Sequence, residues 1–186
     1  LIVHWPAGVP SPKHYKPGSV DDRLIAAIDL GPTMLSIAGA KKPAKMEGEI
    51  FLGDHAAALR QYVFGARDRC DETVFRFRTV RDARYRYIRN FTPERPFLQP
   101  NDYKERSYPV WNLLNELHAA GKLTPVQEVL ARPSMPEEEL YDLSTDPHEI
   151  NNLAKSPDHR ATLNRLRAAL QKWIDDTNDQ GRELEP

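Results

Sequence analysis

Residues 139–154 constrain the fold of this chain more than any other stretch, because they combine a strand with a strongly punctuated turn. Residues 140–143 read Leu-Tyr-Asp-Leu and predict a short, half-buried strand. Asp146 is placed to cap a helical turn, with Pro147 at the first helical position, where its missing N–H costs nothing. Glu149 lies three residues after Asp146, the spacing of a reciprocal capping box. The stretch therefore predicts a strand, a capped turn and a helix entry, and by itself it specifies no chemistry.

The clearest hairpin in the sequence joins residues 74–80 to residues 85–91. Phe75 and Phe77 share one face of the first strand, and the two arginines that alternate with them share the other. We expect the aromatic face to pack inward. Three further strands are expected, at residues 1–5, within 20–28 and at 59–64.

Apolar residues at helical spacing predict four helices. The first begins near Asp29 and ends at Gly39, and the second covers residues 110–120. A capping box at Thr124 opens the third, which runs to about Ala131. The last helix begins at Pro157, and its apolar face consists of Leu163, Leu166, Leu170 and Trp173. Loops or irregular segments are expected at residues 6–18, 65–73 and 92–108.

The formal net charge of −1 gives no global argument for a nucleic-acid or membrane partner. No run approaches the roughly 18–20 apolar residues of a membrane-spanning helix. Cys70 is the single cysteine, which excludes an internal disulfide framework and a cysteine-rich zinc site. Arginines and aromatic residues interleave over residues 60–95 and raise a nucleic-acid hypothesis, but acidic residues dilute that charge and a packed hairpin explains the pattern. We therefore expect neither nucleic acid nor membrane as a partner.

The sequence begins Leu-Ile-Val-His-Trp-Pro, without an initiating Met or a signal peptide. An apolar run at residue 1 is typical of a buried strand that is already under way. We therefore expect the chain to be the C-terminal piece of a longer protein. Its compartment is open, and would be periplasmic or secreted if the complete protein carries a signal peptide.

Several ordered motifs in this chain resemble those of sulfatases, the alkaline-phosphatase-like hydrolases of sulfate esters. They are the strand and Pro/Gly loop that open at 1–6, Asp-Leu-Gly-Pro-Thr within 29–39, the glycine-bounded turn at 48–53, the hairpin at 79–88 and the stretch at 139–154. Their order follows the family's pattern over nearly the whole chain. The insertion at residues 108–131 and the segment 85–91 look most like sulfamidase-type members, such as N-sulfoglucosamine sulfohydrolase.

The resemblance implies an α+β fold: the tail of an α/β/α sulfatase domain plus a small antiparallel sheet packed by a C-terminal helix. Residues 1–56 would be the last strand and helix of the large α/β catalytic domain. Residues 57–186 would be a C-terminal subdomain with the hairpin sheet, a helical insertion at 108–131 and a final helix at 157–177. Without its larger partner the first part would expose apolar surface, so we expect the isolated chain to self-associate or exchange strands.

The resemblance also implies that the complete protein hydrolyses a sulfate ester, or an N-sulfate, of a sulfated small molecule or glycan. Its nucleophile would be a formylglycine made from a C/S-x-P-x-R motif, acting with a calcium ion. Cys70 is followed by Asp-Glu-Thr-Val and does not match that motif. The family's calcium ligands and its catalytic Lys and His residues lie before the strand that contains Leu1. We therefore assign no catalytic or metal residue to this chain, and expect it to be inactive without the missing N-terminal catalytic portion.

Arg67, Asp68 and Arg69 are the candidate substrate-binding residues of this chain. They are expected in a loop after a strand, where arginine could offer two parallel N–H donors to sulfate-like oxygens. The alternative is a solvated loop with local Arg–Asp pairs. His14 and His55 also fall in predicted loops, where they could line a site or simply be exposed.

Two other function classes fit the same sequence. One is a non-catalytic module that holds a sulfated or phosphorylated glycan through its arginine-bearing hairpin and loops. The other is a phosphodiesterase or phosphonate hydrolase of the same superfamily. The coding sequence upstream of Leu1 separates the three. A C/S-x-P-x-R motif there supports the sulfatase, and a Thr or Ser outside that motif favours the phospho-hydrolases. If nothing lies upstream, the binding module is favoured.

Overall fold

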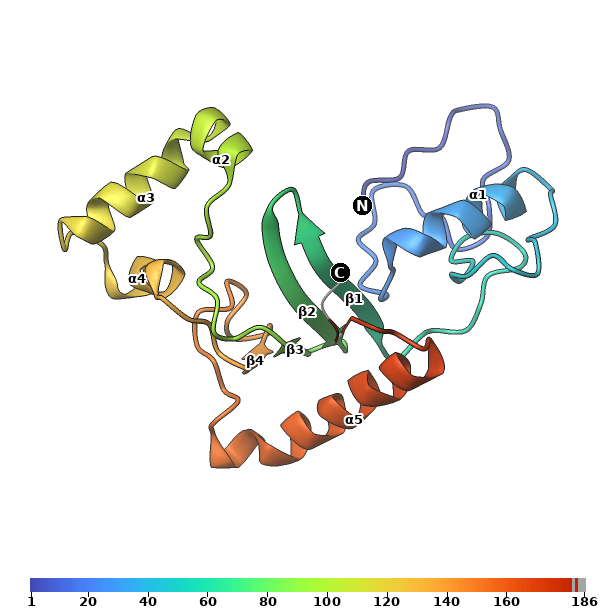
Figure 1. The fold of residues 1–186 in the computed structure, drawn as a ribbon. Helices are drawn as coiled ribbons and strands as arrows, with labels where there is room; N and C mark the ends of the chain where they lie inside the picture. The colour runs from blue at the N-terminus through green and yellow to red at the C-terminus, as the bar shows by residue number, and fades with distance from the viewer. Residues whose placement is uncertain (182, 184–186) are drawn as a thin grey trace. The chain divides into compact units, whose positions relative to one another are not determined.

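The computed structural model describes residues 1–181 and residue 183. The chain divides into two compact units, Leu1–Val63 and Phe64–Pro186, and each is described here by itself (Figure 1). No helix in the described part of the chain is both long and apolar enough to cross a membrane.

Asp29 organises the first unit from a buried position. It ends a short 3-10 helix, Ala27–Asp29, and precedes α1, Leu30–Ile37. Its carboxylate accepts the backbone N–H groups of Ala26 and Glu49, both at 2.7 Å, and pairs with Arg60 at 2.6 Å. The sequence predicted this helix start and its end at Gly39, whose φ of 71° suits glycine. One buried carboxylate thus holds three separate segments together.

The strands predicted at residues 1–5 and within 20–28 are wrong, and the strand predicted at 59–64 is correct only at its last two residues, where a strand begins at Val63. Residues 1–5, 20–28 and 59–62 form no strand, and the side chains of Leu1 and Ile2 are 79% and 96% exposed. A strand is held by hydrogen bonds to a neighbouring strand, and residues 1–62 supply none. Apolar sequence alone was therefore insufficient to form a strand here.

The second unit contains an antiparallel sheet with the strand order β1-β2-β3-β4 (Figure 1). The strands are β1 (Val63–Cys70), β2 (Thr73–Arg81), β3 (Tyr85–Asn90) and β4 (Glu138–Asp142). The predicted hairpin is confirmed, with Val80 opposite Tyr87 and Thr79 opposite Ile88. Tyr87 in turn lies opposite Leu140 of β4. The sheet therefore brings β4, from the stretch at residues 139–154, beside the hairpin.

Helix α5, Arg160–Asp176, packs against β2 and β3 and is drawn in red in Figure 1. Leu163, Leu166, Leu170 and Ile174 form its buried stripe, as helical spacing requires. The sheet contributes Val80, Tyr87 and Leu140, each no more than 1% exposed. This confirms the small antiparallel sheet packed by a C-terminal helix. The structure adds that the arginine face of β2 is buried as well as the aromatic face, because Arg76, Arg78 and Phe75 are all at most 4% exposed.

A polar contact fixes α5 to the sheet beside this apolar core. The hydroxyl of Tyr87 donates to Glu138 at 2.5 Å, and Arg167 of α5 donates to the same carboxylate at 2.8 Å. Burial raises the pKa of Tyr87 to about 12. The phenol therefore stays protonated and keeps donating over the whole neutral range.

Three short helices connect β3 to β4: α2 (Asp102–Ser107), α3 (Pro109–Ala119) and α4 (Pro125–Ala131). The predictions of α3 and α4 are confirmed, including the capping box between Thr124 and Gln127. The helix α2 was not predicted, because its segment was expected to be irregular. Asn101 begins it by accepting the Lys104 N–H at 2.8 Å. A 3-10 turn, Pro157–His159, leads into α5.

The capping box predicted after β4 is wrong. Asp146 does bind backbone N–H groups, those of Ile150 at 2.9 Å and Asn151 at 2.7 Å, but it closes a turn rather than a helix. Glu149 has a φ of 56°, outside the helical region, so a helix cannot continue through it. Its carboxylate pairs with Arg86 of β3 at 2.9 Å instead.

Asp142, at the end of β4, makes the stability of this unit depend on pH. Hydrogen bonds from Arg84 at 2.6 Å and Ser144 at 2.7 Å lower the pKa of its buried carboxyl below the ordinary value. Because the folded pKa lies below the unfolded one, this stabilisation is present above the ordinary value of about 3.9 and is lost as the pH falls further. We expect Asp142→Asn to lower the melting temperature at neutral pH, and the difference from wild type to shrink below about pH 4. Thermal denaturation across that range checks this, and a difference independent of pH would contradict it.

Candidate functional site

The segment that carries the predicted substrate-binding residues is a strand, not a loop. Residues 65–70 belong to β1, and only Asp71 and Glu72 form the turn to β2. Alternation explains the difference: exposed Arg67 and Arg69 flank the half-buried Asp68 on an edge strand. Charged residues are compatible with such a strand because one of its faces and one of its edges can meet water.

Arg67 and Asp68 point to opposite faces of the sheet. Asp68 accepts hydrogen bonds from the buried Arg78 at 2.7 and 3.1 Å. Arg78 also pairs with Asp179, which follows α5. Asp68 is therefore part of the contact between the sheet and the end of α5, and its carboxylate serves the fold.

Arg67 lies over an aromatic group on the other face. Its guanidinium carbon is 4.3 Å from the ring centre of Phe75. The Phe75 ring is in turn 5.1 Å from that of Phe77 and 5.9 Å from that of Phe97. We call Arg67, Arg69, Phe75, Phe77 and Phe97 the arginine–phenylalanine surface. It combines a planar cation with three aromatic rings.

Arg69 shares the strand face of Arg67 because it lies two residues further along β1. Its Nε donates to the backbone carbonyl of Asp71 at 2.7 Å, which leaves its terminal nitrogens outside that bond. The neighbouring Cys70 is exposed, and its Sγ lies 3.9 Å from the Asp71 carboxylate.

Phe97 is the residue of this surface that the sequence did not reveal. It lies in the proline-rich segment after β3, where no periodicity assigns a side chain to a face. The side-chain amide of the buried Gln99 anchors this segment by donating to the Val74 carbonyl at 2.9 Å. The anchor beside β2 explains how Phe97 reaches Phe75, and such a long-range contact has no signal in a single sequence.

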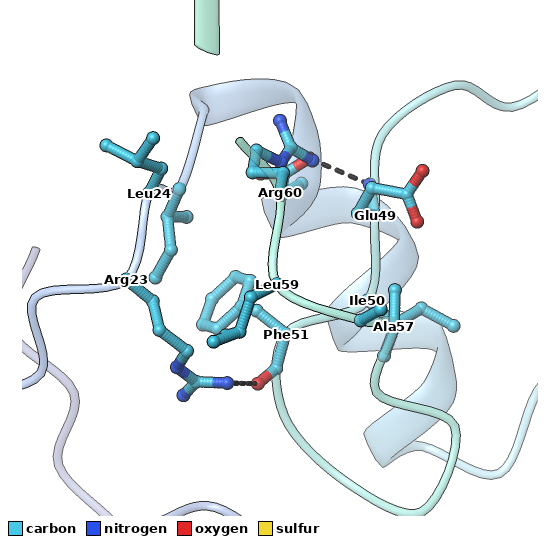
Figure 2. A pocket seen from close by; sticks show the side chains of 11 residues that line it. Arg23, Leu24, Glu49, Ile50, Phe51, Ala57, Leu59 and Arg60 are labelled. Atoms are coloured by element: carbon cyan, nitrogen blue, oxygen red, sulfur yellow. Dashed lines mark hydrogen bonds and ion pairs between the residues drawn. The ribbon is translucent and has the colours of Figure 1, made fainter. Parts of the chain in front are cut away.

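A shallow pocket in the first unit holds two more arginines, Arg23 and Arg60, at its edge (Figure 2). Figure 2 shows Arg23 donating to the Phe51 carbonyl, at 3.0 Å, and Arg23 also pairs with Asp21. Arg60 pairs with the buried Asp29. Both cations are therefore engaged in holding the loops of this unit together.

The two loops that contain His14 and His55 are joined to each other in the first unit. The Gly53 N–H donates to the Lys13 carbonyl at 3.0 Å, and the Lys13 ammonium pairs with Asp54 at the same distance. His14 and His55 follow these residues and are both exposed. Across residues 1–181 and 183, no three His, Cys, Asp or Glu side chains are grouped so as to hold a metal ion. The described residues therefore do not fit a calcium site. Cys70 does not fit a formylglycine precursor, because it is not part of a C/S-x-P-x-R motif.

Comparison with known proteins places this α+β architecture among the sulfatases. Residues 1–132 match the family model described as N-sulphoglucosamine sulphohydrolase, C-terminal. An ulvan-active sulfatase of Formosa agariphila is 39% identical over 98% of this chain, and the human N-sulphoglucosamine sulphohydrolase is 29% identical over 95%. The chain belongs to the N-sulphoglucosamine sulphohydrolase C-terminal family, which confirms the resemblance of its motifs.

The same comparison defines how much of a sulfatase the chain represents. It covers 31% of the Formosa protein and 38% of the human protein, so it spans about a third of the curated relatives it matches. A solved 2-O GAG sulfatase matches 84% of this chain and 26% of its own, with a TM-score of 0.54 and 24% identity. That likeness confirms the fold as one found in sulfatases.

Proposed function

We propose that this chain acts as the C-terminal part of a sulfatase that hydrolyses sulfate esters, or an N-sulfate, of a carbohydrate. The observation that carries the proposal is the family match over residues 1–132. The names of the relatives support a carbohydrate substrate, because they refer to ulvan and to N-sulphoglucosamine. The second unit contributes a rigid sheet and helix that would support the edge of such a substrate site.

The nucleophile and metal would come from an N-terminal portion that this chain does not include. In the proposed enzyme a bound calcium ion would stabilise charge on the sulfate and orient it, and a formylglycine would serve as nucleophile. The described residues offer no ligand set for that ion, so no catalytic step is assigned to them. We propose that the N-terminal portion also covers apolar side chains exposed in the first unit, such as Leu1, Ile2 and Met34.

The coding sequence upstream of Leu1 tests the proposal against its two alternatives. A C/S-x-P-x-R motif followed by an acidic metal-ligand set would support the sulfatase. A Thr or Ser nucleophile outside such a motif would favour a phosphodiesterase or phosphonate hydrolase. An upstream region with neither would leave the chain a glycan-binding module. Assays of the longer protein with sulfated and phosphorylated forms of one sugar would separate the same three functions.

A further inference from the structure

We propose that Arg67 contacts a sulfate group of the glycan, and that the arginine–phenylalanine surface forms the contact area around it. The inference rests on the proposed function, because it takes the substrate to be a sulfated sugar. Of the three substrate-binding residues predicted from sequence, Arg67, Asp68 and Arg69, it assigns the sulfate contact to Arg67 alone. Asp68 is excluded because its carboxylate is bound to Arg78 on the opposite face.

Arg67 is held in position by the ring of Phe75. The guanidinium carbon lies over the ring, 4.3 Å from its centre. The N–H donors of a guanidinium lie in its plane, and an aromatic ring beneath it takes up none of them as a carboxylate would. Two parallel N–H groups match two oxygens of a sulfate, as they match those of a carboxylate or phosphate. The ring therefore holds the cation in place while its donors stay available.

Arg67 contrasts with those arginines of the sheet that pair with carboxylates. Within residues 1–181 and 183, no hydrogen bond or ion pair engages its side chain, and it is exposed. The arginines of β2 and β3 that have carboxylate partners are Arg78 with Asp68 and Asp179, Arg86 with Glu149, and Arg89 with Glu137. An arginine held by a ring, with no carboxylate partner in the described part of the chain, keeps its charge available for an incoming anion.

The aromatic residues would contact the sugar ring that carries the sulfate. Phe97 is 37% exposed at the edge of the cluster, whereas Phe75 is 1% exposed beneath Arg67. A sugar ring has an apolar C–H face that can pack on an exposed aromatic ring by burial and dispersion. Arg69, on the same strand face, places a second positive charge nearby. A pyranose carrying a sulfate matches this combination of ring and cation.

Binding of a heparin-derived oligosaccharide to this chain tests the assignment. We expect the side-chain Nε–H resonance of Arg67 to shift during an NMR titration. We expect Arg67→Gln to raise the Kd about tenfold or more, the range for losing a charge-assisted pair of hydrogen bonds. Arg67→Lys keeps the charge but loses the planar fork, so its Kd should fall between those of wild type and Arg67→Gln.

Arg106→Gln is the matched control. Arg106 lies on α2, its side chain is 80% exposed, and its loss removes the same charge from the same unit. Its Kd should stay within about twofold of wild type, since only long-range attraction changes. A desulfated oligosaccharide should bind neither variant nor wild type. The inference is overturned if wild type does not bind the sulfated oligosaccharide, if Arg67→Gln binds within twofold of wild type, or if Arg67→Lys binds as wild type does.

A measurement on the longer protein keeps this inference separate from the proposed function. If that protein releases sulfate but Arg67→Gln leaves its KM unchanged, Arg67 is not the contact and the sulfatase proposal stands. The opposite result is also possible: the longer protein releases no sulfate, but the isolated chain still binds the sulfated oligosaccharide through Arg67. The sulfatase proposal then fails, and the assignment of Arg67 as the sulfate contact stands. A raised KM with little change in kcat is the result expected for a binding contact away from the reacting atoms.

Discussion

Replacing Arg78 with methionine is expected to lower the free energy of unfolding of the second unit by about 3–5 kcal/mol, the range for removing one partner of a buried ion pair. Arg78 is 1% exposed and binds two carboxylates, Asp68 on β1 and Asp179 after α5. Without it, the Asp68 and Asp179 carboxylates would both lose this buried guanidinium. Gly181, which follows α5, lies so close to the Arg78 guanidinium that a Cβ at this position would overlap it.

Urea denaturation followed by far-UV circular dichroism measures this change. Arg81→Met is the control, since Arg81 lies on the same strand but is exposed. Its effect should stay within about 0.5 kcal/mol, as for most surface substitutions. A loss below about 1 kcal/mol for Arg78→Met, the range of an exposed ion pair, would show that the cluster does not hold α5 to the sheet.

The second large effect is expected for Leu166→Ala, which should lower the free energy of unfolding by about 2–5 kcal/mol. Leu166 is 0% exposed, on the apolar stripe of α5 that packs on the sheet. Truncation removes buried methyl groups and leaves a cavity that the surrounding side chains close only in part. Val80 and Leu140 of the sheet are also fully buried.

Gln171→Ala provides the comparison for this substitution, because Gln171 is exposed on the same helix and alanine is an excellent helix former. The same urea titration applies, and a change of less than about 0.5 kcal/mol is expected for the control. If Leu166→Ala destabilised no more than the control, α5 would not form the core of this unit.

The elements that sequence reasoning found share a local signal. The alternation of aromatic and charged residues along β2 and β3 predicts the hairpin, and the helical spacing of leucines predicts α5. The capping box at Thr124 predicts the short helix α4. In each case the residues that specify the element lie within it.

The errors arise where the outcome depends on distant residues or on one dihedral angle. The apolar start of the chain reads as a strand, but strand formation needs a partner that residues 1–62 do not provide. Asp146 and Glu149 have the spacing of a capping box, yet the positive φ of Glu149 prevents a helix. Residues 65–70 of β1 were assigned to a loop because charged residues resemble a loop when the strand beside them is unknown.

The candidate site could be predicted only in part for the same reason. The sequence singled out Arg67, but as one of three charged residues in a presumed loop. Which of the three is available depends on contacts far along the chain: Asp68 is bound to Arg78, and Arg67 lies over Phe75. The approach of Phe97 to Phe75 is set by folding and has no local signal.

The central claim is that this chain is one part of a sulfatase, and its most direct test is the release of inorganic sulfate from a sulfated oligosaccharide. The longer protein, which joins this chain to its N-terminal portion, should release sulfate over many turnovers. Exchange of its formylglycine precursor for alanine should abolish release, and this chain alone should release none. Sulfate release by the isolated chain, or hydrolysis of phosphodiesters but not sulfate esters by the longer protein, would contradict the claim.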